Sequence, residues 1–86
     1  RNGDIPKLTT FAMSTFKPGD STKEHEHPTM YEVFYLTSGK AIFTIAGKEI
    51  KVRAGESLVI EPGEKHFQSN PFDLNVSWIY FGIATD

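Results

Sequence analysis

Turn-forming residues interrupt this chain of 86 residues so often that it lacks the periodicity of a long amphipathic helix. Short runs rich in β-branched and aromatic residues lie between the interruptions, which is typical of β-strands. Several short strands at regular spacing indicate a β-sandwich or a small barrel. The interruptions are Lys17-Pro18-Gly19-Asp20, Pro28, Ser38-Gly39, Ala46-Gly47, Ala54-Gly55, Pro62-Gly63 and Asn70-Pro71.

The sequence predicts one all-β domain over residues 1–86, because a chain of this length is too short to bury two separate cores. Residues 1–7 are expected to form an extended N-terminal segment. Ala46-Gly47, between two alternating runs, is the strongest candidate for a tight hairpin. The expected strands are Leu8–Phe16, Thr22–His27, Tyr31–Thr37, Lys40–Ala46, Lys48–Arg53, Ser57–Glu61, His66–Ser69 and Leu74–Ala84.

The alternation within the strands predicts which side chains face the interior. If Glu32 points inward, Phe34 and Leu36 do so too, and Val33 and Tyr35 point outward. Both faces of several strands are apolar, whereas a barrel whose outside meets water alternates more cleanly. We therefore expect part of the outer surface to be covered, most simply by a second copy in a homodimer. A covering N-terminal segment is the alternative.

Composition excludes several classes of function. The chain has no cysteine, so it has neither a disulfide nor a thiolate metal ligand. Its net charge is −2 and its nine basic residues are scattered, which argues against nucleic acid as a partner. The longest apolar stretch, around Trp78 to Ala84, is far shorter than the ~20 residues of a membrane span. We expect a cytoplasmic protein that does not bind membranes.

All three histidines of the chain fall at spacings that suit metal ligands. His25 and His27 are two residues apart, which on a strand places both imidazoles on one face. Glu32 follows closely, and His66 comes after the turn at Pro62-Gly63. Three imidazole nitrogens and one carboxylate suit a divalent transition metal. The sequence therefore predicts a metal site inside an all-strand scaffold.

These spacings resemble the two sequence motifs of the cupin superfamily. The first motif matches at every position of Gly19-x5-His25-x-His27-x4-Glu32-x6-Gly39. The second matches Gly55-x7-Gly63-x2-His66-x3-Asn70, except that Glu61 stands where the pattern has proline. The resemblance implies a small single-domain cupin, which is a jelly-roll barrel or double-stranded β-helix. It also implies a central metal held by His25, His27, Glu32 and His66, and frequently a homodimer.

The donor set favours some metals over others. A tetrahedral Zn²⁺ would be filled by four protein ligands, although zinc is not excluded. Six-coordinate Mn²⁺, Fe²⁺, Ni²⁺ or Co²⁺ would keep two positions open for O₂ or for a bidentate substrate. A dication beside one carboxylate leaves net positive charge, which attracts an anionic or enolisable oxygen ligand.

The first functional hypothesis is a metal-dependent oxygenase that acts on a small substrate coordinated in the barrel. Tyr80 is the candidate catalytic acid or base, because no second conspicuous acid or base shares the expected inner face. Gln68 lies on the same strand face as His66 and could bond a ligand. The expected pocket residues are Phe34, Phe43, Gln68, Trp78 and Tyr80.

Two other functions compete with the oxygenase. A non-catalytic module that binds or senses a small ligand, with a structural metal, suits the small size of the chain. A sugar isomerase or epimerase is a weaker alternative, since no cluster of Arg or Lys on an inner face could hold a phosphate. The cupin scaffold carries unrelated functions, so the fold does not choose among these three.

Overall fold

A computed structural model describes residues 7–85, which fold into strands without any helix. The strands are β1 (Leu8–Phe16), β2 (Met30–Ser38), β3 (Lys40–Ile45), β4 (Lys48–Arg53), β5 (Ser57–Ile60), β6 (His66–Ser69) and β7 (Val76–Ala84). Their bounds differ from the expected ones by at most two residues, apart from one expected strand that is considered below. The expected N-terminal segment, residues 1–7, lies outside the described residues except for its last member. No helix long and apolar enough to cross a bilayer occurs within residues 7–85.

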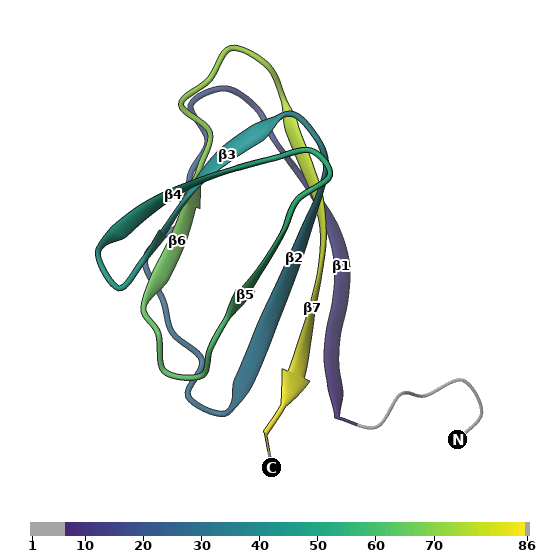
Figure 1. The fold of residues 1–86 in the computed structure, drawn as a ribbon, viewed down its shortest axis with the longest axis vertical. Helices are drawn as coiled ribbons and strands as arrows, with labels where there is room; N and C mark the ends of the chain where they lie inside the picture. The colour runs from purple at the N-terminus through teal and green to yellow at the C-terminus, as the bar shows by residue number, and fades with distance from the viewer. Residues whose placement is uncertain (1–6, 86) are drawn as a thin grey trace, which may run out of the picture.

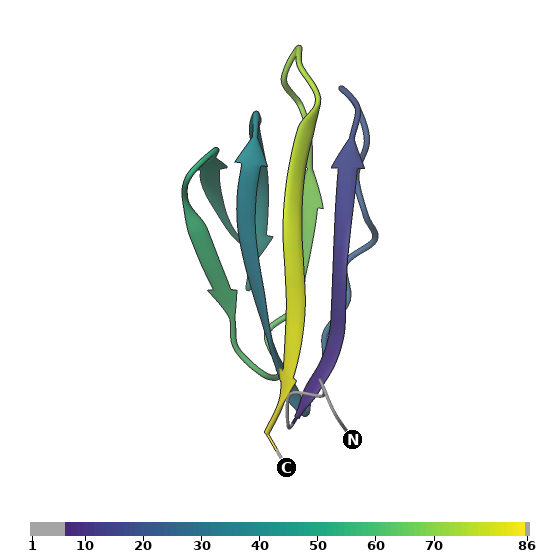
Figure 2. The ribbon, with the colours of Figure 1, turned by 90° about the vertical axis from the view of Figure 1, so that its right-hand side faces the viewer.

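The strands form two sheets that face each other, as in a jelly roll (Figure 1). The larger sheet has the order β1-β7-β2-β5, and its face is seen in Figure 2 with the smaller sheet behind it. The smaller sheet has the order β4-β3-β6. All the pairings are antiparallel, and each sheet contains strands that are far apart in sequence. The all-β class and the jelly-roll architecture are thereby confirmed.

The core fills the space between the two sheets. On β2, Glu32, Phe34 and Leu36 are buried while Tyr35 is 45% exposed, as the alternation predicts. Inward side chains of both sheets interdigitate in the way that sandwich cores do. The buried apolar residues are Phe34, Leu36, Ala41, Phe43, Ile45, Val52, Ile60, Val76 and Trp78.

The predicted hairpin at Ala46-Gly47 joins β3 to β4. Ile45 pairs with Lys48, so the loop contains two residues, and both have positive φ, 50° at Ala46 and 81° at Gly47. Positive φ at both loop positions defines a type I′ turn, whose twist matches that of the flanking strands. The sequence signal therefore located this turn correctly.

The expected strand Thr22–His27 is not a regular strand. Ser21 pairs with Ser69 and His25 pairs with His66, and these are isolated bridges beside β6. From the first bridge to the second, the chain advances four residues between Ser21 and His25 but only three between His66 and Ser69. The segment that carries His25 therefore holds one extra residue, as in a β-bulge. The regular ladder breaks because the Thr22 hydroxyl, rather than a backbone carbonyl, accepts the N–H of Gln68. Segment 21–27 still lies along the edge of the smaller sheet and carries two histidines.

Asn70 connects the chain beyond β6 to two other segments. Its side chain is 1% exposed, and its amide nitrogen donates to the carbonyls of Phe16 and Leu74. Its side-chain oxygen accepts the N–H of Phe72. Asn70 is therefore a buried structural residue that orders the loop between β6 and β7.

Candidate metal centre

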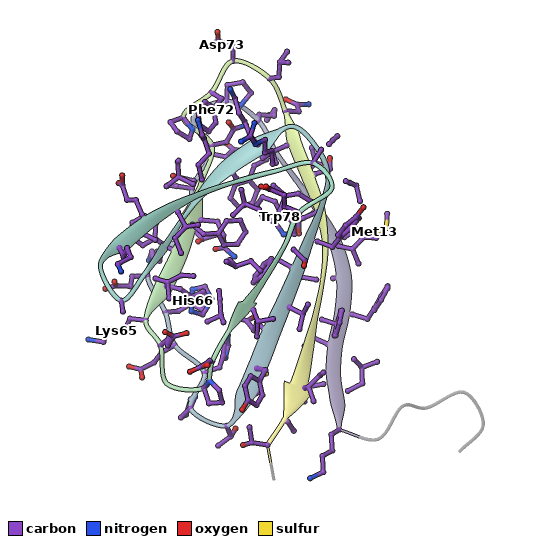
Figure 3. The ribbon with its side chains drawn as sticks, viewed as in Figure 1. Met13, Lys65, His66, Phe72, Asp73 and Trp78 are labelled. Atoms are coloured by element: carbon purple, nitrogen blue, oxygen red, sulfur yellow. The ribbon has the colours of Figure 1, made fainter. Side chains whose placement is uncertain are left out.

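His25, Glu32 and His66 come together from three different segments at one side of the core. One ligand atom from each lies within 4.8 Å of the others. Glu32 is on β2 in the larger sheet, His66 begins β6 in the smaller one, and His25 bridges to it. In Figure 3, His66 points into the space between the sheets while Lys65 points away. The three side chains form a His/Glu/His cluster that could hold a metal ion.

Backbone carbonyls fix the orientation of two of the imidazoles. The Nδ1 atom of His66 lies 3.0 Å from the carbonyl of Glu64, and that of His25 lies 2.9 Å from the carbonyl of Lys23. A carbonyl only accepts hydrogen bonds, so Nδ1 must be the protonated nitrogen in each ring. The Nε2 atom of each neutral ring then carries a free lone pair. Metal-binding histidines are commonly oriented in this way by their second nitrogen.

Two buried polar atoms in the cluster lack a hydrogen-bond partner. The atoms are Nε2 of His66 and Oε1 of Glu32, which are 2.7 Å apart without the geometry of a hydrogen bond. When His66 is neutral, both atoms present lone pairs to each other, and such an arrangement is unfavourable in a buried place. Cis ligands at roughly 2.1 Å from one ion are about 3.0 Å apart. The donor set and its spacing therefore fit a divalent metal.

His27 lies at the outer side of the cluster. Its Nε2 is 3.7 Å from Oε2 of Glu32, and its side chain is 41% exposed. The rings of His25 and His27 are 5.2 Å apart, so the two imidazoles remain neighbours although the expected strand is irregular. His27 does not belong to the group of three residues whose ligand atoms all lie within 4.8 Å of one another, so its role as a fourth ligand stays a prediction.

The charges of the cluster shift two pKa values in opposite directions. Burial would raise the pKa of Glu32, but the contact with His66 and the three imidazoles lower it below its usual 4.5. Burial would lower the pKa of His66, but Glu32 and the Glu64 carbonyl raise it above its usual 6.5. Protonated His66, which is positively charged, and ionised Glu32 thus stabilise each other.

These shifts predict the pH dependence of stability when a chelator keeps metal away. The contribution of His66 is complete below pH 6.5 and is lost as pH rises through its raised pKa. The contribution of Glu32 is complete above pH 4.5 and is lost as pH falls through its lowered pKa. The thermal midpoint is therefore expected to be highest between these two values. Glu32→Gln should flatten this profile, and a midpoint that rises steadily above pH 6.5 would contradict the ion pair.

A pocket of about 290 Å³ opens beside the cluster. Of the expected pocket residues, Phe34, Gln68, Trp78 and Tyr80 line it, together with His25, His27 and Glu32. Phe43 does not line it. Its side chain is fully buried behind Phe34, with the two rings edge to face at 5.0 Å, so that part of the prediction is corrected.

The sequence reasoning missed the wall of the pocket that β1 and its neighbours supply. The unpredicted lining residues are Thr10, Ser14, Phe16, Thr22 and Met30. On β1, polar Thr10 and Ser14 face the pocket while apolar Phe11 and Met13 are exposed. This is the reverse of the usual alternation. Period-2 spacing on β1 could have revealed Thr10, Ser14 and Phe16 only if the inner face of that strand had been known beforehand.

Comparison with known proteins places the fold in a family. The family model described as a cupin domain matches residues 12–82. The chain is also similar to a predicted oxalate decarboxylase from Thermotoga maritima, with 27% identity and a TM-score of 0.87. That alignment covers 91% of this chain and 68% of the Thermotoga protein. No curated protein matches the chain.

Two further solved structures are similar. For a cupin protein from Bacteroides fragilis, the identity is 25%, the TM-score is 0.81, and 86% of this chain aligns with 64% of that one. For an oxalate oxidase, the values are 28% and 0.77, and 87% of this chain aligns with 41% of that one. The chain thus spans less than two thirds of both of these proteins. With a family model matched over most of its length, the chain belongs to the cupin family.

Proposed function

We propose that this cupin is a metal-dependent enzyme of the oxygenase type. His25, His27, Glu32 and His66 would hold one divalent ion of manganese, iron, nickel or cobalt, with zinc a less favoured occupant. The observation that carries the proposal is the unpartnered pair of buried atoms on Glu32 and His66 beside a pocket. The ion would supply Lewis acidity or a redox centre for a substrate that coordinates it.

The residues of the pocket would position that substrate and limit its access to water. Phe34 and Trp78 form buried apolar walls, and the ring of Tyr80 stacks on Phe34 at 5.5 Å. Apart from the proposed ligands, Tyr80 is the one titratable side chain among the described lining residues. Any proton transfer by the protein at this place would therefore fall to the Tyr80 hydroxyl.

The function is tested by oxygen uptake. Iron-loaded protein is expected to consume O₂ with at least one compound among small organic acids, diketones, thiols and phenols. His66→Ala should abolish this uptake, while Lys65→Ala, which changes the exposed neighbour, should leave it unchanged. Absence of uptake with every metal and every compound would contradict an oxygenase.

A second candidate is a non-catalytic module that binds a small ligand through the metal. The scarcity of acid and base groups in the pocket favours it. It predicts ligand binding to the metal-loaded protein without turnover. The sugar isomerase or epimerase stays the weaker alternative, because no lysine or arginine that could hold a phosphate occurs among the described residues that line the pocket.

We further propose that the outer face of the larger sheet binds a second copy of the chain. Paired residues form an apolar row across four strands, namely Phe11, Phe81, Val33 and Val59. Met13 is 75% exposed on the same face and points away from the barrel in Figure 3. The outward positions of the larger sheet carry no charged residue in this register. Two copies of this face would therefore meet without electrostatic repulsion.

This interface predicts the mass of the protein in solution. Light scattering is expected to give twice the mass of one chain, and Met13→Glu should reduce it to that of one chain, because a charge would be buried in the apolar contact. Lys51→Glu, on the outside of the smaller sheet, is the matched control and should leave the mass unchanged. A single-chain mass for the unchanged protein would contradict the dimer.

A further inference from the structure

The side-chain amide of Gln68 is held in one orientation by Thr22. The Thr22 hydroxyl accepts the backbone N–H of Gln68 at 3.1 Å and donates its own proton to Oε1 of Gln68 at 2.7 Å. The backbone N–H of Thr22 also donates to the Gln68 carbonyl at 3.0 Å. The bond from the Thr22 hydroxyl to Oε1 fixes the direction of the amide nitrogen, and the two bonds to the backbone of Gln68 hold Thr22 in place beside it.

The amide nitrogen of Gln68 remains available for a ligand. It makes no hydrogen bond to any residue in the described range 7–85, although Gln68 is only 5% exposed. Gln68 lines the same pocket as His25, His27 and Glu32. Among the described residues, the buried side-chain atoms without a partner are Oε1 of Glu32 and Nε2 of His66, so the Gln68 nitrogen is not fully buried and can donate to a ligand or a water in the pocket. The pocket therefore presents a directed neutral donor next to the proposed ion.

The charges around the pocket limit the charge of a ligand. A divalent ion and the Glu32 carboxylate together leave one positive charge. The described lining residues include no lysine or arginine that would add to it, and much of the wall is aromatic. A monoanion would make the site neutral, whereas a dianion would leave one uncompensated negative charge in apolar surroundings.

We propose that the ligand of this site is a small monocarboxylate with a second oxygen at C2, a 2-oxo or 2-hydroxy acid, whose carboxylate accepts a hydrogen bond from Gln68. Thr22 is the positioning residue that aims this donor. The inference rests on the proposed metal site. The pocket has a volume of about 290 Å³, which is several times the roughly 30 Å³ that one water molecule takes in the liquid. An acid with a few non-hydrogen atoms therefore fits in it.

The test is a titration of Co²⁺-loaded protein with pyruvate, followed by the visible absorption bands of the ion. Thr22→Val is expected to weaken pyruvate binding about tenfold without changing the affinity for Co²⁺, because one directed hydrogen bond is lost. Thr22→Ser should restore it. Thr37→Val is the matched control, since it also removes one hydroxyl hydrogen bond, to the carbonyl of Ser77, at a residue that does not line the pocket.

Two comparisons test whether Thr22 acts by positioning the Gln68 amide and whether the site prefers a monoanion to a dianion. In a Gln68→Met background, Thr22→Val should have no further effect on pyruvate binding, because the amide that it orients is gone. Oxalate, a dianion of similar size that chelates through two carboxylate oxygens, should gain less from the protein than pyruvate does, when each affinity is divided by that for free Co²⁺.

The outcomes distinguish the ligand from the metal site. Equal pyruvate affinity in the unchanged protein and in Thr22→Val, or a larger gain for oxalate, would overturn the proposed ligand class while leaving the metal site intact. Absence of cobalt bands in the unchanged protein would overturn the metal site itself, and this inference with it.

Discussion

Replacing His66 by alanine is expected to remove the thermal stabilisation that the proposed divalent metal would give to this protein. His66 is 1% exposed, and its Nε2 is one of the two buried side-chain atoms without a partner within residues 7–85. Metal at a thousand times its Kd stabilises a folded protein by about 4 kcal/mol. That free energy corresponds to a rise of roughly 15–30 °C in the midpoint of a domain of this size.

The measurement is the difference between the midpoints with Mn²⁺ and with chelator, taken for each variant. This difference separates metal binding from the cost of the cavity that alanine leaves. Lys65→Ala should retain the full difference, because Lys65 is exposed and points away from the site (Figure 3). If His66→Ala kept the same metal-dependent rise as the unchanged protein, His66 would not be a ligand.

Gly39→Ala is expected to cost more than 3 kcal/mol of the free energy of unfolding, on the order of half the stability of a small domain. Gly39 joins β2 to β3 with a φ of 73°, and a Cβ there would overlap the carbonyl oxygen of Asn75 and lie 2.9 Å from Cα of Val76. Both contacts are with backbone, which cannot move without displacing β7 from the core.

Gly55→Ala provides the matched control for this variant. Gly55 also has a positive φ, 88°, but a Cβ there would meet nothing within 4 Å. Its substitution should cost only the roughly 1–2 kcal/mol of a left-handed residue with a side chain. Urea unfolding of both variants measures the difference. Equal losses would show that the backbone conformation alone, and not the contact with Asn75, makes Gly39 necessary.

The strands and their faces could be predicted because they depend on local pattern. Burial alternates along β2 as expected, and the two-residue hairpin at Ala46-Gly47 follows from the conformations that those residues can adopt. The expected strand Thr22–His27 is wrong, because the spacing of these residues suits a strand but only isolated bridges form there. The pairing that breaks the ladder, Thr22 with Gln68, joins residues 46 positions apart, and local pattern does not reveal such a contact.

The site was predicted less completely than the fold. The spacing of the histidines indicated a metal and led to the cluster of His25, Glu32 and His66. Which residues line the pocket depends on which side chains are packed into the core instead. Phe43 packs behind Phe34 and so is withdrawn from it, and Thr10 and Ser14 enter it from a strand whose outer side is apolar. The set of lining residues follows from how the two sheets pack together, and the alternation within a single strand does not predict that packing.

The central claim is that one divalent ion is held by three imidazoles and one carboxylate. The most direct test is the X-ray absorption spectrum of protein loaded with one equivalent of Mn²⁺ or Co²⁺. The account predicts a shell of nitrogen and oxygen ligands, with the outer-shell scattering of three imidazole rings. A spectrum that matches the hydrated ion, without imidazole scattering, would contradict it.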